Sequence, residues 1–224
     1  MTTPDLKSRI LLAASETPSA TRPVSRAYTW LVAPASMIAA AALYFAFEGP
    51  SHSAGRPTWF YLASTIGWAC VAALSMWGAL GRGGSAVGRP RSWLVAFAVG
   101  TPATLFALMF AAALARPELK EIVANPPKGY RCFGLTLAAA AFPLLALSLA
   151  RRGSDPTHPV ATGAALGAAC GASAGVMVEM WCPVAAPAHV AFGHILPIVI
   201  LTGLGMALGA RFIAMRARPG TPKA

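Results

Sequence analysis

The sequence predicts an all-α fold, a membrane-embedded bundle of six transmembrane helices. Of its 224 residues, 56% are hydrophobic and 11% are charged, against about 25% charged in typical soluble domains. The mean hydropathy is +0.60. The apolar residues gather in six long runs that are nearly free of charge. A helix needs about 20 such residues to cross the hydrocarbon core of a bilayer, so lipid must solvate much of this chain.

Residues 1–26 precede the first apolar run and form a predicted cytoplasmic tail. A threonine, a proline and an aspartate at positions 3–5 are typical of a helix start, because they supply a capping hydroxyl, a fixed φ and an acid in the first turn. The short amphipathic helix that follows is marginal alone, so it either docks into a protein partner or lies on the membrane surface. Its candidate contact residues are Leu6, Arg9, Ile10 and Leu11.

The six runs are predicted to be helices because none shows the alternating pattern of a barrel strand. The first three open on aromatic residues, Tyr28, Trp59 and Trp93, whose rings favour the headgroup layer. The fourth run is the shortest, the fifth is rich in glycine and alanine, and the sixth contains Pro197. The predicted spans are 27–47, 59–80, 93–115, 133–150, 160–180 and 191–214. They form one membrane domain, 27–215, followed by a basic C-terminal tail, 216–224.

The arginines and lysines predict the orientation of this bundle. With both termini in the cytoplasm, 13 of the 18 basic residues lie in inner segments and five lie in outer ones, as the positive-inside rule requires. The formal net charge of +11 is therefore explained by topology. Because the basic residues are spread over four segments with no interleaved aromatic stripe, we expect no direct nucleic-acid binding.

Glycines recur every fourth residue along the fifth span. This spacing makes a smooth groove that lets another helix approach closely. The groove is expected to pack against another helix of the same chain, with homodimerisation as the alternative. The four residues are Gly163, Gly167, Gly171 and Gly175.

Enzymes and ion-coupled transporters of membranes usually place ionisable groups inside their spans. Here only Glu179 and His194 fall there, both toward the predicted outer ends, and no hydrolase, metalloprotease or phosphate-loop motif is present. We therefore expect no enzymatic activity, no catalytic residues and no cofactor.

Cys132 and Cys182 flank the hairpin of the fourth and fifth spans, at the outer interface. They can form a structural disulfide, act as a regulatory thiol pair, or simply pack. A metal site completed by Glu179, His189 and His194 is a further alternative, but no tight ligand spacing supports it. Cys132 opens a helix beside a basic residue, so we expect it to be the more acidic thiol. The residues alone leave these alternatives open.

The segment from position 131 to position 216 resembles the C-terminal half of the NrsF-type family of bacterial membrane anti-sigma factors. The first two spans match by pattern only. The resemblance rests on Cys132, Pro143, Arg151-Arg152-Gly153, Pro159, Glu179-Met180-Trp181-Cys182-Pro183, His189 and Arg211.

This resemblance implies a protein that holds an extracytoplasmic-function sigma factor at the inner membrane and represses its regulon. It further implies that Cys132 and Cys182 are sensor thiols and that an envelope, metal, oxidative or light-driven cue, as in carotenoid regulation, releases the sigma factor. A small membrane transporter or thiol-redox carrier is the alternative reading, and an assembly or scaffold subunit is a third.

Overall fold

The computed structural model describes residues 26–48, 58–81, 89–115, 129–152, 154–155, 157–182, 184 and 186–214. The predicted tail helix, with Leu6, Arg9, Ile10 and Leu11, lies outside these residues, as does the segment 216–224. The described part of the chain is all-α, and six of its helical segments are long and apolar enough to cross a membrane. The first five are α2 (Arg26–Glu48), α3 (Thr58–Leu80), α4 (Arg91–Ala115), α6 (Tyr130–Ala150) and α7 (Pro159–Trp181). The sixth runs continuously through α8 (Pro187–Val190), η1 (Ala191–Ile195), α9 (Leu196–Leu208) and η2 (Gly209–Ile213).

The predicted spans agree with these helices to within a few residues, and the largest differences concern the fourth and sixth. Helix α6 begins at Tyr130 because Gly129 adopts a left-handed conformation (φ 67°) and its carbonyl accepts a hydrogen bond from the N–H of Phe133. Cys132 therefore lies in the first turn of α6, whereas the sequence placed it ahead of the span. The sixth helix begins at Pro187 and contains two π-helical segments, η1 and η2.

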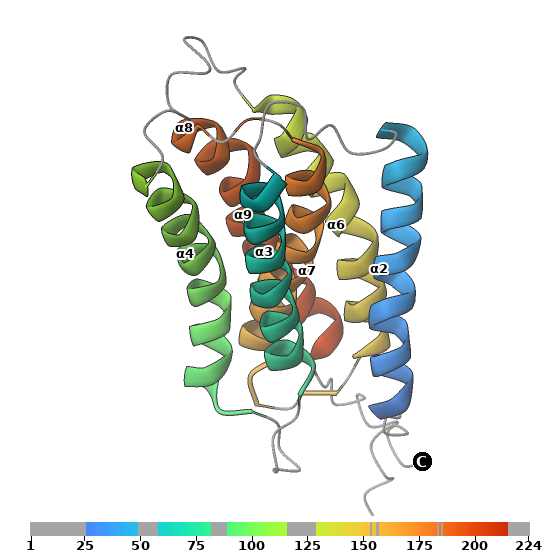
Figure 1. The fold of residues 1–224 in the computed structure, drawn as a ribbon. Helices are drawn as coiled ribbons and strands as arrows, with labels where there is room; N and C mark the ends of the chain where they lie inside the picture. Colours follow the sequence, from blue (N-terminus) through green and yellow to red (C-terminus); the bar gives the residue numbers. More distant parts are fainter. Residues whose placement is uncertain are drawn as a thin grey trace, which may run out of the picture.

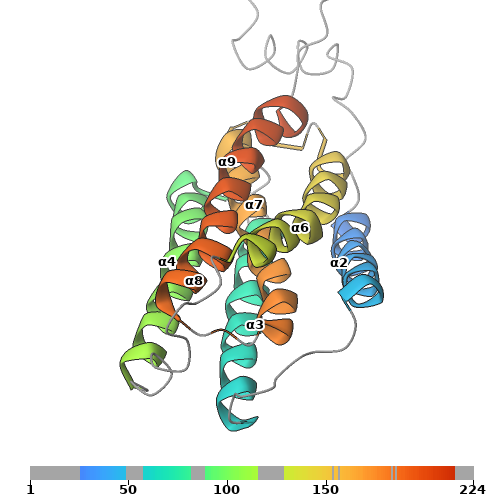
Figure 2. The ribbon, with the colours of Figure 1, turned by 90° about the horizontal axis from the view of Figure 1, so that it is seen from above.

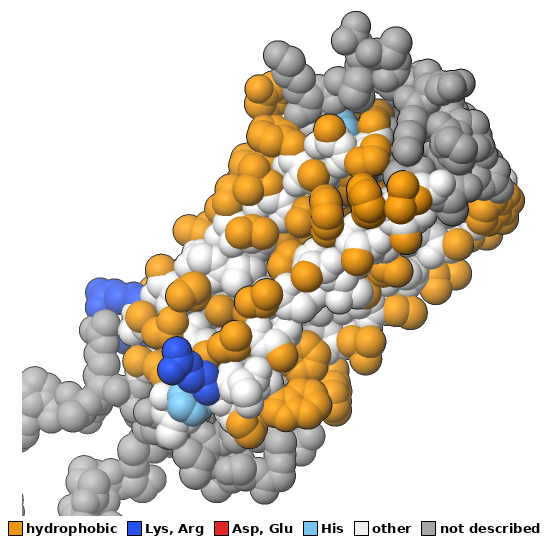
Figure 3. All heavy atoms as spheres, turned by 90° about the vertical axis from the view of Figure 1, so that its left-hand side faces the viewer, with side chains coloured by type: hydrophobic (Ala, Val, Ile, Leu, Met, Phe, Trp, Pro, Cys, Tyr) orange, Lys and Arg blue, Asp and Glu red, His pale blue; other side chains and the backbone are white. Residues whose placement is uncertain are grey.

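Successive helices run in opposite directions, so both ends of the described chain lie at the same end of the bundle (Figure 1). We call this the arginine end, because Arg89, Arg91, Arg151, Arg152 and Arg211 lie there, and the opposite end the cysteine end, because it carries Cys132 and Cys182. Figure 3 shows one face of the bundle covered by hydrophobic side chains, with basic side chains gathered at one end. Such a surface suits lipid solvation between two polar boundaries.

Helix α7 forms the centre of the bundle, with α3, α4, α6 and α9 around it (Figure 2). In its most apolar stretch, 83% of the residues are buried, against 22% to 44% in the other five spans. Helix α2 lies at the periphery and packs chiefly against α6. The bundle is therefore a packed core of five helices with α2 attached at one side.

The glycine stripe of α7 packs within the chain. A Cβ atom at Gly163 would overlap the carbonyl of Gly205 on α9, and one at Gly167 would overlap the carbonyl of Leu201. Further along the stripe, Gly175 faces the ring of Trp68 on α3. Because these neighbours fill the groove, it has no room for a helix of a second copy.

The arginine end of the core is held together by hydrogen bonds around Asp155. Its carboxylate accepts bonds from the N–H groups of Thr157 and His158 and from the hydroxyl of Thr162 on α7, while its own N–H donates to the carbonyl of Ile213. Burial alone would raise the pKa of Asp155, but these hydrogen bonds outweigh it and lower the pKa below its usual value. The turn therefore joins α7 to the end of the sixth helix with a carboxylate that stays ionised at neutral pH.

Candidate functional site: a cysteine and histidine cluster beside a peripheral helix

The cysteine end brings the two predicted sensor thiols together. Cys132 lies in the first turn of α6, and Cys182 is the residue that ends α7. Both thiols are free, and each residue is only 3% exposed. Their sulfur atoms lie within 4.8 Å of each other, so a small movement brings them to bonding distance.

Two histidines of the sixth helix complete the cluster. His189 and His194 each place a ring nitrogen within 4.8 Å of both sulfur atoms, and Nε2 of His189 lies 3.2 Å from Sγ of Cys182. All four residues are buried. We call these four residues, Cys132, Cys182, His189 and His194, the thiol–imidazole cluster.

The π-helix explains why two histidines five positions apart meet at one point. In a π-helical turn each N–H bonds to the carbonyl five residues back, so residues i and i+5 come to lie above one another. His189 lies in α8, and His194 lies in η1, the π-helical segment that directly follows α8. Their ring centroids are 5.6 Å apart. In a regular α-helix, with 3.6 residues per turn, a spacing of five would point the two rings in different directions.

Two glycines allow the first turn of α6 to approach η1 closely. A Cβ atom at Gly193 would lie 3.1 Å from the carbonyl oxygen of Gly129 and 3.2 Å from Cβ of Cys132. Gly129 also needs its left-handed conformation, which L side chains rarely adopt. The contact therefore holds Cys132 against the histidine-bearing segment.

A carboxylate lies directly behind the cluster. Oε2 of Glu179, on the last turn of α7, is 3.7 Å from Nδ1 of His194, and both side chains are completely buried. The ring of Trp68 packs edge-on to His194, with ring centroids 6.0 Å apart. An acid and an imidazole are thus held together in an otherwise apolar enclosure.

The surroundings favour Cys182 as the more acidic thiol. Its hydrogen bond with Cys132 lowers the pKa of Cys182 most, and the His189 imidazole lowers it further, while burial acts in the opposite direction. The sequence suggested Cys132 for this role because of the preceding arginine and the helix start. That suggestion missed the histidine, which lies seven positions after Cys182 and reaches it only in the folded chain.

The residues adjoining each cysteine connect the cluster to α2. Arg131 forms an ion pair with Glu48, the last residue of α2, and its guanidinium carbon lies 4.5 Å from the ring centroid of Trp181. The indole N–H of Trp181 donates to the backbone carbonyl of Glu48 at 3.3 Å. We call Glu48, Arg131 and Trp181 the outer latch. Sequence reasoning missed it, because a glutamate at position 48 gives no hint of partners more than 80 residues away.

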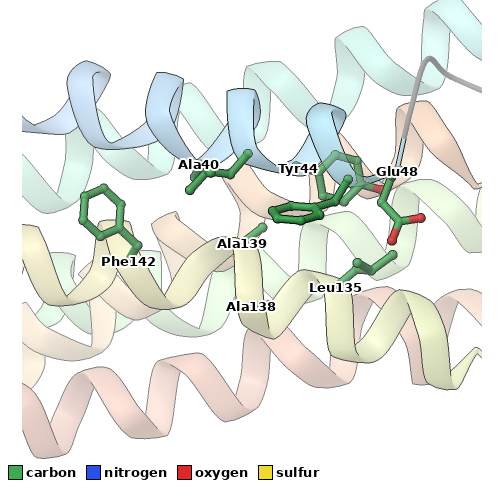
Figure 4. A pocket seen from close by; sticks show the side chains of 9 residues that line it. Ala40, Tyr44, Glu48, Leu135, Ala138, Ala139 and Phe142 are labelled. Carbon is green, nitrogen blue, oxygen red and sulfur yellow. The ribbon is translucent and has the colours of Figure 1, made fainter.

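Apolar grooves flank α2 on both sides. One of about 260 Å³ lies between α2 and α6 below the latch (Figure 4). Another of about 570 Å³ lies between α2, α3 and α7. The first is lined by Ala40, Tyr44, Glu48, Leu135, Ala139 and Phe142. Between these grooves α2 packs chiefly against α6, and the outer latch adds polar contacts at its end.

Comparison with curated proteins and with solved structures finds no match. A family model does match, over residues 12–214, and that stretch contains all six helices that are long and apolar enough to cross a membrane, the thiol–imidazole cluster and the outer latch. The family is described as NrsF, negative regulator of sigma F. The match extends well beyond the C-terminal half on which the sequence resemblance was strongest. This six-helix chain therefore belongs to the NrsF family of negative regulators of sigma F.

Proposed function

We propose that this protein is an anti-sigma factor of the bacterial inner membrane, which holds an extracytoplasmic-function sigma factor on the cytoplasmic side and so represses its regulon. The family match over residues 12–214 is the observation that carries this proposal. The arginine end faces the cytoplasm, because basic residues concentrate on that side of membrane proteins. Helix α2 begins at this end, so the tail that precedes it emerges where the sigma factor is found.

The tail makes the principal contact with the sigma factor. Leu6, Ile10 and Leu11 supply an apolar stripe for a groove on the partner, and Arg9 adds charge beside it. The arginines between spans face the same compartment and add to the electrostatic attraction.

The thiol–imidazole cluster senses the cue on the opposite side. With hydrogen peroxide as oxidant, Cys132 and Cys182 form one S–S bond, and the two thiol hydrogens combine with the two hydrogens and two oxygens of the peroxide to give two molecules of water. Either this step or another change at the sulfur atoms displaces the first turn of α6 and the last turn of α7. Singlet oxygen, or a change in metal-ion supply, would act at the same atoms.

The outer latch passes this change to the tail. Arg131 precedes Cys132 and Trp181 precedes Cys182, and both hold Glu48 at the outer end of α2. Because α2 lies at the periphery and packs chiefly against α6, a shift of the latch tilts or slides the helix and moves the tail at its inner end.

Copurification tests the proposed function. The chain is expressed in membranes together with the sigma factor encoded beside it, and is then solubilised gently and captured through a C-terminal tag. We expect a stoichiometric complex from membranes and no soluble pool of the sigma factor. The proposal would be wrong if the protein inserted correctly but captured no sigma factor, and the sigma factor remained soluble.

Reversing the charge of Glu48 tests the latch. We expect Glu48→Lys to raise expression from a sigma-dependent reporter without any cue, because two positive charges then repel across the latch. Glu48→Gln removes only the ion pair and keeps an acceptor, so its effect should be less than about fivefold, as exposed ion pairs contribute at most about 1 kcal/mol.

The double variant Glu48→Lys with Arg131→Glu restores an ion pair of opposite direction. It should return the reporter part of the way to repression, with the lost arginine–tryptophan contact accounting for the remainder. Equal reporter levels in the single and double variants would show that the pair does not hold α2.

A further inference from the structure

We propose that the thiol–imidazole cluster is a binding site for one zinc-class divalent ion, held by the sulfur atoms of Cys132 and Cys182 and by one ring nitrogen each of His189 and His194. This ion clips α6, α7 and the sixth helix together at the cysteine end. Only the regulatory role of this site rests on the proposed function. Ion binding itself can be measured without the sigma factor.

The number and kind of ligands match this class of ion. Two sulfur and two imidazole donors are a recurrent structural zinc set, with tetrahedral geometry. Zn–S distances of about 2.3 Å and Zn–N distances of about 2.0–2.1 Å place the ligands of such a site about 3.3–3.8 Å apart. The four ligand atoms here all lie within 4.8 Å of one another, and Sγ of Cys182 is already 3.2 Å from Nε2 of His189. A contraction of no more than about 1 to 1.5 Å therefore assembles the site.

Glu179 occupies the place of an outer partner for a metal-bound histidine. A ligating imidazole commonly presents its second nitrogen to a carboxylate, which orients the ring and makes the ligand more basic. Nδ1 of His194 lies 3.7 Å from Oε2 of Glu179, and this leaves Nε2 for the ion. Neither ring nitrogen of His194 has a hydrogen-bond partner of good geometry in the described part of the chain, although the residue is completely buried. An ion accounts for this buried, polar ring.

The charge balance also favours a divalent ion. Two thiolates and two neutral imidazoles around a divalent cation sum to zero, so the ion offsets the thiolate charge that a buried enclosure would otherwise hold. The enclosure is tight, since Cys132, Cys182, His189 and His194 are each 5% exposed or less.

The ion fixes the outer latch. Its ligands come from the first turn of α6, the end of α7 and the α8–η1 segment, and two of them directly follow Arg131 and Trp181. Occupancy of the site therefore holds both partners of Glu48 in the positions described, and loss of the ion releases them.

Cadmium and zinc titrations of the purified, reduced, metal-depleted full-length protein test the site. We expect one Cd²⁺ per chain, with the ultraviolet absorption of cadmium–thiolate bonds, and competition by Zn²⁺. Cys132→Ser and Cys182→Ser should each lose most of this absorption. His189→Ala and His194→Ala should weaken binding at least tenfold. Glu179→Gln, which alters only the orienting carboxylate, should weaken it by about 10–100-fold.

Cys70→Ser and His158→Ala are the matched controls, because both residues lie outside the cluster. These two variants should bind the ion as the parent does.

The same samples are assayed for helicity and for copurified sigma factor, so that the two proposals fail separately. A folded protein that binds cadmium no better than the Cys132→Ser/Cys182→Ser variant overturns the ion site, even where it holds the sigma factor. Unchanged affinity in both histidine variants overturns the assignment of the imidazoles. One ion per chain with the expected losses supports the site, and absence of the sigma factor from that sample counts against the proposed function alone.

Discussion

Replacing Gly163 or Gly167 by alanine is expected to disrupt the bundle severely, because each would place a methyl group against the backbone of a neighbouring helix. At both positions the new Cβ would overlap a backbone carbonyl of α9, and a helix backbone cannot rotate away as a side chain can. Helices α7 and α9 must then separate, which breaks contacts along the central helix. Overpacking of a well-packed core typically costs about 1–3 kcal/mol, and a clash between two backbones belongs at or above the upper end.

Unfolding of detergent-solubilised variants, followed by circular dichroism or by fluorescence, measures this loss. The matched control is Gly203→Ala on α9, where a Cβ meets nothing within 4 Å. This change should be neutral or stabilising by up to about 1 kcal/mol, because alanine is the better helix former. If Gly163→Ala and Gly203→Ala unfold alike, α7 and α9 do not pack at the distance described.

Deleting residues 2–20 is expected to abolish sigma-factor binding and to leave membrane insertion intact. The deletion removes Leu6, Arg9, Ile10 and Leu11 but keeps all six spans and Arg26, from which α2 begins. Insertion depends on the spans, which are unchanged, and on nearby basic residues; the deletion removes Lys7 and Arg9 but keeps Arg22 and Arg26 beside the first span. Loss of a whole apolar docking face should weaken the complex by more than about 100-fold, or about 2.7 kcal/mol.

The measurement is copurification from solubilised membranes, with the reporter as a second readout. Deletion of 216–224 is the control, because this segment is also basic and follows the helix that ends at the arginine end. It should bind the sigma factor as the parent does. Full sigma-factor binding after deletion of residues 2–20 would indicate that the loops between spans make the contact. An equal loss of binding after both deletions would indicate that the basic charge of the tails, and not the apolar face, attracts the sigma factor.

The six helices were predictable because the requirement for them is local. A span needs a long apolar run with polar flanks, and this can be read from consecutive residues. Where local turn geometry decides, the prediction was less accurate. Helix α6 begins three residues before the predicted start of the fourth span, because Gly129 adopts a left-handed conformation. This places Cys132 in the first turn of the helix.

For the glycine stripe of α7, too, the sequence predicts a local property, whereas the fold selects the partner. The spacing of Gly163, Gly167 and Gly171 indicates a close helix contact, yet the identity of the partner depends on the arrangement of helices. Helix α9 takes that place through Gly205 and Leu201, while Trp68 of α3 covers Gly175.

For the site, the amino-acid sequence was enough to predict the class of protein, the family resemblance and the two outer cysteines, because hydropathy, charge bias and motif residues can be read position by position along the chain. That His189, His194 and Glu179 join those cysteines became evident only in the folded chain. Their convergence requires a π-helical turn, a close approach of Gly129 to Gly193, and the antiparallel placement of α6 and α7. The latch of Glu48, Arg131 and Trp181 was likewise settled only by packing, since contacts across more than 80 residues depend on which helices become neighbours.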